Sequence, residues 1–293
     1  MQLKFKLIVI IFVLALGALV LRLVLDTGDR DVADKRSVAV EKTVTKSALP
    51  PVTLKRVRRG QELPAFAEIR DIPTRKAEFF NFLMPAIAEQ NTLILQQRAQ
   101  LKRLHEMYHS GAKFSSRENR WLSELALHYR VETTNRSEMF ATLLRRVDVI
   151  PDTLVLVQAA NESGWGTSRF AREANNLFGE WCWSPGCGIV PNSRPEGQIY
   201  EVRKFDSVTA SVRSYIRNLN THHAYQDLRQ IRADLRSDGK QVTAQPLTHG
   251  LMAYSERGED YINELNQMIR VNLPIIRDVR ETFNEGSLQA QVQ

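Results

Sequence analysis

The sequence lacks the motifs that mark several common classes of ligand-binding protein. It has no Walker loop, no G-x-G-x-x-G loop, no zinc-finger spacing, no glycine-rich RNA-binding motif and no internal repeat. These absences leave nucleic acid as the least supported partner. The net charge of +7 and the isoelectric point of about 9.5 nevertheless favour an anionic partner. The candidates that remain are a lipid surface and an acidic cell-wall polymer.

Cysteine is also scarce. Cys182 and Cys187 are the only two, and they bracket Trp-Ser-Pro-Gly. A metal site is poorly supported because there is no second pair. In an exported protein we expect the two to form a small disulfide loop, with Pro185-Gly186 supplying the turn. A pair of reduced thiols is the alternative.

The only long apolar run lies at the N-terminus. Lys4 and Lys6 precede an unbroken apolar stretch from residue 7 to residue 21, and Arg22 follows it. Its length is at the upper end for a signal-peptide core and slightly short for a membrane span. No convincing small-x-small cleavage site follows. We therefore expect residues 1–26 to form an uncleaved anchor, with a cleaved signal peptide as the alternative. Both export the rest of the chain.

The rest of the chain divides into a polar segment and a series of helices. Residues 27–66 have no sustained period and predict a flexible linker. Residues 67–146 predict a helical N-terminal region, and residues 275–293 a C-terminal tail. Apolar spacing predicts helices over 76–109 (interrupted at Pro85), 118–128, 137–146, 152–162, 207–219, 225–236 and 259–270. The expected fold is mainly α, of α+β type, with a small β or irregular lobe around residues 180–204.

Residues 105–109 read HEMYH, which matches the zinc signature H-E-x-x-H. His105 and His109 would share a helix face, but a zinc site also needs a third ligand and a buried setting. The predicted helix stops at Ser110-Gly111, and nothing marks His128 as a ligand. We therefore expect a solvated helix end, no metal and no cofactor.

The stretch most indicative of chemistry is IPDTLVLVQAANESGWG at residues 150–166. It predicts a helix that is buried nearly all round and capped by Gly164. Glu162 lies in its last turn, on the same side as Gln158. Burial and the negative end of the helix dipole both raise the pKa of a carboxyl. Glu162 is thus a candidate general acid for a glycosidase. A structural glutamate paired with an arginine is the alternative.

Four sequence blocks support this interpretation: ESGWG at 162–166, NNLFG at 175–179, KFDSVTASVRSYIRNLNTHHAY at 204–225 and LTHGLMAYSERGEDYINEL at 247–265. In this order they resemble the N-acetylglucosaminidase domain of glycoside hydrolase family 73, found in bacterial peptidoglycan hydrolases. The Bax-like exported proteins of Gram-negative bacteria are the most similar branch. The resemblance covers roughly residues 145–272, and we assign the glucosaminidase domain to residues 147–274.

The resemblance implies a lysozyme-like fold and hydrolysis of the β-1,4 bond after N-acetylglucosamine in peptidoglycan. It also implies a location in the periplasm. The apolar run at residues 7–25 would hold the protein at the inner membrane, with a cleaved secreted form as the alternative. Glu162 would be the general acid, and Tyr254 would line the cleft near the reaction centre. The implied substrate-binding residues are Gln158, Trp165, Asn175, Asn176 and Phe178. Trp165 and Phe178 have core packing as their alternative role.

The second carboxylate is where this sequence departs from the family pattern. Glu196, beside Gly197 at a predicted loop tip, is our preferred candidate, and Glu201 and Glu180 are the alternatives. With none of them in place, the acetamido group of the substrate would assist instead. The alternative functions are a non-catalytic cell-wall binding protein and a lytic transglycosylase.

Two further groups of residues have ordinary interpretations. His222 and His223 are expected to border a helix. Arg229, Arg232 and Arg236 recur at helical spacing and predict a solvated basic face, with a face that binds peptidoglycan carboxylates as the alternative.

Overall fold

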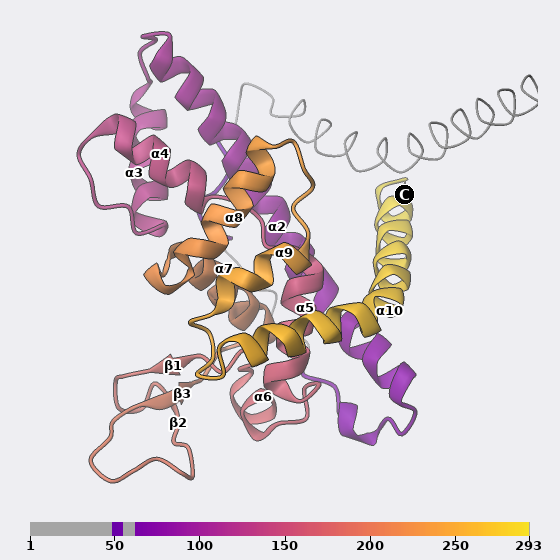
Figure 1. The fold of residues 1–293 in the computed structure, drawn as a ribbon. Helices are drawn as coiled ribbons and strands as arrows, with labels where there is room; N and C mark the ends of the chain where they lie inside the picture. Colours follow the sequence, from indigo (N-terminus) through magenta and orange to yellow (C-terminus); the bar gives the residue numbers. More distant parts are fainter. Residues whose placement is uncertain (1–48, 55–61, 293) are drawn as a thin grey trace, which may run out of the picture. The chain divides into compact units, whose positions relative to one another are not determined.

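The computed structural model describes residues 49–54 and 62–292. Most of these residues are helical, and one small sheet of three short strands completes the fold (Figure 1). This confirms the expectation of a mainly α protein with a small β lobe. The expected membrane helix at residues 7–25 lies outside the described residues. Within the described part, no helix is both long and apolar enough to cross a membrane.

Each helix predicted from the apolar periodicity is present, but the short helices Arg169–Ala174 and Ala244–Thr248 were not predicted, and the last helix runs well beyond its predicted end at residue 270. The α-helices are α2 (Ile72–His109), α3 (Ser116–His128), α4 (Arg136–Arg146), α5 (Asp152–Ser163), α6 (Arg169–Ala174), α7 (Val208–Thr221), α8 (Gln226–Ser237), α9 (Ala244–Thr248) and α10 (Glu259–Val292). The short 3-10 helices are η1 (Phe66–Glu68), η2 (His223–Tyr225) and η3 (His249–Leu251). The strands are β1 (Trp181–Cys182), β2 (Gly188–Ile189) and β3 (Glu201–Arg203). His222 borders both α7 and η2, as expected.

Helix α2 runs for 38 residues without the interruption expected at Pro85. Its start is fixed by Asp71, whose carboxylate accepts the backbone N–H of Thr74 at 2.9 Å. Pro85 faces solvent, whereas Met84 and Ala86 on either side are buried. Packing of these neighbours therefore holds the helix together across the backbone hydrogen bond that proline cannot donate.

Helix α5 is enclosed by other helices. All residues from 153 to 160 are buried, and α5 packs against α2, α9 and α10 (Figure 1). The cause lies in the sequence, because this stretch offers almost no polar side chain to a solvent-facing stripe. Burial fixes α5 in place, and with it the position of the glutamate in its last turn.

The expected linker and tail both contribute to the packed structure. Trp121 donates its indole N–H to the carbonyl of Pro50 at 2.7 Å, and Phe66 packs edge-on against Phe79. The segment 27–66 therefore ends in apolar residues that bury on the helices. Helix α10 continues through residue 275 to Val292, with Ile276 and Val279 in the core. Residues 275–292 are accordingly part of a helix and not a separate tail.

The prediction of a solvated basic face on α8 is wrong. Arg232 is buried and donates to the carbonyls of Arg145 at 2.9 Å and Val149 at 3.0 Å. Arg229 is also buried, and Arg236 donates to Asp148 at 2.5 and 2.7 Å. The guanidinium groups of Arg229 and Arg232 are enclosed because carbonyl oxygens satisfy their donors, whereas Arg236 stays exposed beside Asp148.

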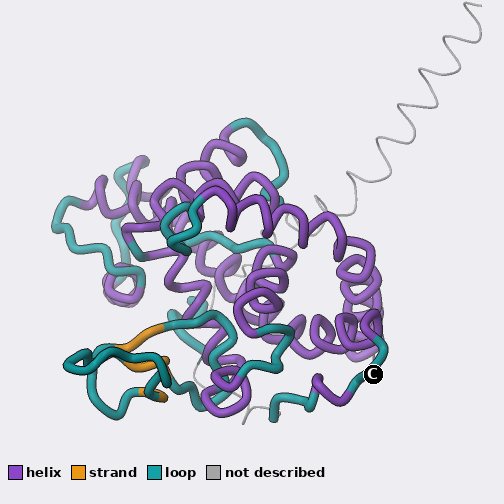
Figure 2. Tube along the Cα trace, turned by 60° about the horizontal axis from the view of Figure 1, so that its bottom comes forward, coloured by secondary structure: helices purple, strands orange, loops and turns teal. Residues whose placement is uncertain are grey.

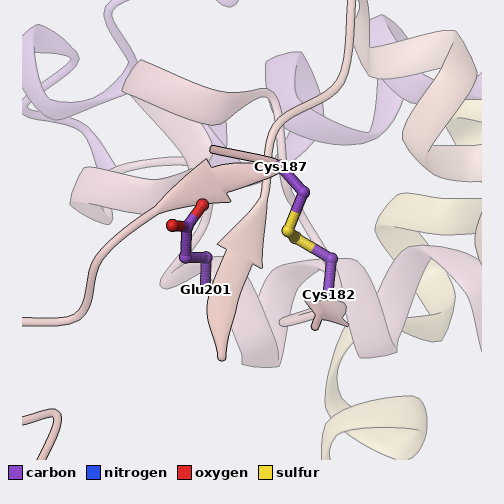
Figure 3. Close-up of side chains that lie close together, drawn as sticks. All are labelled: Cys182, Cys187 and Glu201. Carbon is purple, nitrogen blue, oxygen red and sulfur yellow. A yellow bond between two sulfur atoms is a disulfide. The ribbon is translucent and has the colours of Figure 1, made fainter. Parts of the chain in front are cut away.

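The β lobe is an antiparallel sheet in the order β1-β3-β2. Figure 2 shows its strands and loops gathered beside the helices. The predicted disulfide between Cys182 and Cys187 is confirmed. The Glu201 carboxylate accepts the backbone N–H groups of Gly186 at 2.9 Å and Gly188 at 2.7 Å, and it lies beside the disulfide (Figure 3). Glu201 thus ties the disulfide loop to the central strand.

Candidate active site

A cleft of about 1110 Å³ lies where the end of α5, helix α7 and the β lobe meet. Its walls include Glu162, Tyr254, residues 178–181 and one face of α7. A concave site of this size with a few convergent polar groups is the expected form of a small-molecule or oligosaccharide site. The four sequence blocks thus converge on one cleft.

The turn after α5 gives Glu162 its place. Gly164 ends the helix in a left-handed conformation (φ 56°), and Trp165 and Gly166 also have positive φ. A Cβ on Gly166 would lie 2.8 Å from the Phe66 ring, so only glycine permits this close approach. The turn is therefore pressed onto the core, while Glu162 in the last turn of α5 reaches the cleft.

Glu162 is held by hydrogen bonds and not by an ion pair. Its Oε1 accepts from the Tyr261 hydroxyl at 2.7 Å and from Asn161 at 3.4 Å. Burial raises the pKa of Glu162, and the two hydrogen bonds only partly oppose this effect. Among the described residues no cation forms an ion pair with Glu162. Arg257, the cation whose charge acts on Glu162, forms its ion pair with Glu264 at 2.7 Å. The alternative of a structural glutamate paired with an arginine therefore does not describe this site.

Gln158 lies beneath the site and not in it. Its side chain is 0% exposed, so the predicted contact with a substrate has no surface on which to form. Its Nε2 donates to the Tyr261 hydroxyl at 2.9 Å, and its Oε1 accepts from Tyr215. Gln158 therefore orients Tyr261, which in turn orients Glu162.

Tyr254 and Phe178 form the wall beside Glu162. The Tyr254 hydroxyl donates to the Phe178 carbonyl at 2.9 Å, and its ring stacks on Tyr261 with centroids 5.5 Å apart. Phe178 stacks on Tyr215 at 4.0 Å. Both Tyr254 and Phe178 line the cleft, but Phe178 is buried, which is its alternative role in core packing.

The two asparagines and the tryptophan among the predicted substrate contacts have structural roles instead. Asn175 donates to the carbonyl of Phe205 at 3.0 Å, and Asn176 donates to the carbonyls of Glu180 and Arg203, both at 2.9 Å. Neither asparagine lines the cleft. Trp165 packs against Phe79, Phe80 and Lys76, which is its alternative role in core packing.

Of the three candidates for the second carboxylate, the structure places Glu180 in the cleft. Its side chain is 14% exposed. One oxygen accepts from Ser214 at 2.7 Å and lies 4.0 Å from Arg203, while Oε1 has no hydrogen-bond partner among the described residues. Burial raises the pKa of Glu180, although Ser214 and Arg203 oppose the shift.

The other two candidates lie elsewhere. Glu196, the preferred choice from the sequence, is exposed and does not line the cleft. The two backbone hydrogen bonds from Gly186 and Gly188 lower the pKa of Glu201 and commit its carboxylate to the disulfide loop. Sequence reasoning also missed Tyr261 and Ser214, which lie inside quoted blocks but have no distinguishing local pattern.

The HEMYH histidines lie at the C-terminal end of α2, where their rings contact each other. Within the described part of the chain, the only three residues grouped closely enough to suggest a metal site are Cys182, Cys187 and Glu201 (Figure 3). The sulfur atoms of this group are joined in the disulfide.

Comparisons with known proteins agree with the geometry of the site. The family model described as mannosyl-glycoprotein endo-beta-N-acetylglucosaminidase matches residues 137–273. Protein bax of Escherichia coli (strain K12) is 37% identical over 224 residues, which cover 75% of this chain and 78% of that protein. No solved structure matches the chain. With its matched blocks gathered around one cleft, the chain belongs to the glucosaminidase family, glycoside hydrolase family 73.

Proposed function

We propose that this protein is a peptidoglycan hydrolase, an endo-β-N-acetylglucosaminidase with a lysozyme-like fold and Glu162 as general acid. The observation that carries the proposal is the setting of Glu162. It is a largely desolvated carboxyl in a cleft, with no ion-pair partner among the described residues. Burial favours its protonated form, and a general acid must hold a proton that it can give to the leaving oxygen.

The hydrogen bonds of Glu162 support Oε2 as the oxygen that transfers the proton. Tyr261 and Asn161 both donate to Oε1, which leaves Oε2 for the substrate. Oε2 lies 4.0 Å from the place where a Cβ of residue 179 would stand, and Gly179 leaves that space open. We infer that the glycosidic oxygen binds there and receives the Oε2 proton as the bond to the sugar carbon breaks.

Glu180 is the best-supported second carboxylate. A hydroxyl donor from Ser214 and the nearby Arg203 cation both favour its anion, and Glu162 has no cation so close. In the proposed reaction Glu180 accepts a proton from a water molecule, whose oxygen forms the new bond to the sugar carbon. Glu162 ends deprotonated, and the product has inverted configuration. With assistance by the acetamido group of the substrate instead, Glu180 would be dispensable.

The deciding experiment digests purified peptidoglycan with the wild-type enzyme and with Glu162→Gln, and identifies the products by mass spectrometry. The wild type should release chains with a reducing N-acetylglucosamine end, and Glu162→Gln should release none while its circular dichroism stays unchanged. Glu196→Gln, an exposed glutamate outside the cleft, is the matched control. Anhydro sugar ends would indicate a transglycosylase, and binding without cleavage by the wild type would indicate a scaffold protein.

We also propose that the protein acts in the periplasm, anchored through residues 7–25. The Cys182–Cys187 disulfide supports this proposal because such bonds persist in oxidising compartments. Protease added to spheroplasts should digest the protein, which should sediment with the inner membrane. Protection from the protease would contradict the periplasmic location. Recovery of all the protein in the soluble fraction would contradict the anchor.

A further inference from the structure

One end of the cleft collects positive charge. Arg130, which follows α3, Arg217 on α7, and His222 directly after α7 all line this end. We call these three residues the cationic end. Arg130 is far in the sequence from Arg217 and His222, so the fold brings it to them.

Among the described residues, no aspartate or glutamate forms an ion pair with any member of the cationic end. The other two arginines of the cleft differ in this respect, because Arg169 lies 3.2 Å from Glu173 and Arg203 lies 4.0 Å from Glu180. The guanidinium groups of Arg130 and Arg217 therefore remain unneutralised on a concave surface, and such a surface attracts an anionic ligand.

The two guanidinium charges of this end repel each other, and His222 is driven toward its neutral form. Burial, and then the charge of Arg130, lower the pKa of Arg217. The pKa of His222 is lowered by burial, then by His223 and Arg130. The orientation of the Arg217 guanidinium is fixed by a hydrogen bond, because its Nε donates to the carbonyl of His128 at 3.0 Å. A bound carboxylate would relieve this repulsion and accept the remaining guanidinium donors.

Helix α7 relates the cationic end to the reaction centre. Ser214, Arg217 and Thr221 line the cleft at three- and four-residue spacing, and thus form one stripe along the helix. Ser214 contacts Glu180. At a rise of about 1.5 Å per residue, Arg217 is roughly 5 Å and Thr221 roughly 10 Å farther along the axis. The anion bound there therefore belongs to a part of the substrate beyond the reacting bond.

We propose that the cationic end binds a carboxylate of the peptide that peptidoglycan carries on a sugar near the cleaved bond. The inference rests on the proposed function and narrows its substrate class to glycan strands that bear acidic peptides. Arg130 and Arg217 supply guanidinium groups, which pair with carboxylates through parallel N–H donors.

The experiment compares two preparations of the same peptide-bearing strands, both acetylated on their amino groups. One keeps its carboxylates, and in the other they are converted to methylamides. The wild type, Arg130→Gln and Arg217→Gln are assayed on both preparations for cleavage. Binding is measured separately in a Glu162→Gln background, so that the site can be judged without turnover. Arg120→Gln, an exposed arginine on α3 outside the cleft, is the matched control.

We expect the wild type to prefer the carboxylate strands about tenfold or more, in cleavage and in binding. Arg130→Gln and Arg217→Gln should each reduce that preference without changing the values on the methylamide strands. Equal cleavage and binding of both preparations by the wild type would overturn the inference, and so would an equal loss on both in Arg130→Gln, the variant at the exposed position. Absence of cleavage with retained carboxylate-dependent binding would instead refute the proposed function and leave the cationic end as a binding site.

Discussion

The Tyr261 hydroxyl donates to Glu162 Oε1 at 2.7 Å, joining two residues 99 positions apart. Tyr261 itself accepts from Gln158, which is fully buried one turn before Glu162 on α5. The phenol is thus fixed from below and determines the orientation of the carboxyl. This contact lets the last helix of the fold control the ionisation of an acid on α5.

Replacing Tyr261 with phenylalanine should shift the pH dependence of activity. The hydrogen bond from Tyr261 lowers the pKa of Glu162, so its loss raises that pKa further. Activity requires protonated Glu162 and falls as pH rises through its pKa, so the alkaline limb of kcat/KM against pH should move upward. A hydrogen bond to a charged group contributes about 1.5–3 kcal/mol, which corresponds to a shift on the order of one pH unit.

Tyr129→Phe is the control for that measurement. The Tyr129 hydroxyl donates to Gln97 at 2.9 Å in the core, away from the cleft. Both variants leave a buried glutamine group without its partner and should lose about 1–3 kcal/mol of stability. Only Tyr261→Phe should move the alkaline limb. An equal displacement in both variants would show that lowered stability, and not the contact with Glu162, is responsible.

Glu180→Gln should lower turnover by about 10²- to 10⁴-fold, the usual contribution of a general base. It should also stabilise the protein at neutral pH. Burial raises the folded-state pKa of Glu180, so the wild type loses stability as pH rises from the unfolded toward the folded value. Thermal melts at pH 4 and pH 7 should therefore diverge between variant and wild type only at pH 7. Normal turnover in Glu180→Gln would favour assistance by the substrate.

Trp183 should act as a platform for sugar rings. Its side chain is 66% exposed, Trp181 beside it is 48% exposed, and both line the cleft. Exposed aromatic surface within a polar groove marks a binding site. Trp183→Ala should raise KM about three- to tenfold with little change in kcat, since aromatic contacts contribute about 0.5–1.5 kcal/mol. Val271→Ala removes a comparably exposed apolar side chain outside the cleft and should change neither constant.

Asp148→Asn should destabilise the fold without touching the cleft. Burial alone would raise the pKa of Asp148, but Arg232, Arg236 and Arg98 together outweigh it and lower that pKa. The carboxylate thus stabilises the protein above its unfolded pKa, and this contribution disappears as pH falls through the folded value. Loss of one partner of such a buried pair costs about 3–5 kcal/mol. Urea unfolding at pH 7 measures the loss, and Asp278→Asn, an exposed aspartate, should show almost none.

Local patterns in the sequence predicted the parts of the site that depend on local structure. The unbroken apolar run and Gly164 specify a buried helix with Glu162 in its last turn, and these features need no distant contact. The sequence did not identify Glu180 as the preferred second carboxylate, because its position depends on Asn176. The Asn176 side chain bonds both the N–H and the carbonyl of residue 180. That bracing turns the carboxyl toward Ser214 on α7, and sequence spacing does not reveal such a contact.

The buried arginines of α8 show the opposite limit. Their spacing is typical of a solvated face, and periodicity alone could not show that carbonyls from residues 145, 148 and 149 would surround Arg232. A charged side chain is buried when the fold supplies oxygen atoms around it. Those oxygens come from a segment more than 80 residues earlier in the chain.

The contact between Phe66 and Gly166 has a practical consequence for anyone who shortens this chain. The family match begins at residue 137, yet the turn behind Glu162 rests on an aromatic ring contributed 100 residues earlier. An excised fragment of residues 137–273 would lose that ring and the whole of α2, and would expose the apolar flank of α5 to water. We therefore expect a stably folded piece to need a start before Phe66 and, because Ile276 and Val279 also lie in the core, an end beyond Val279.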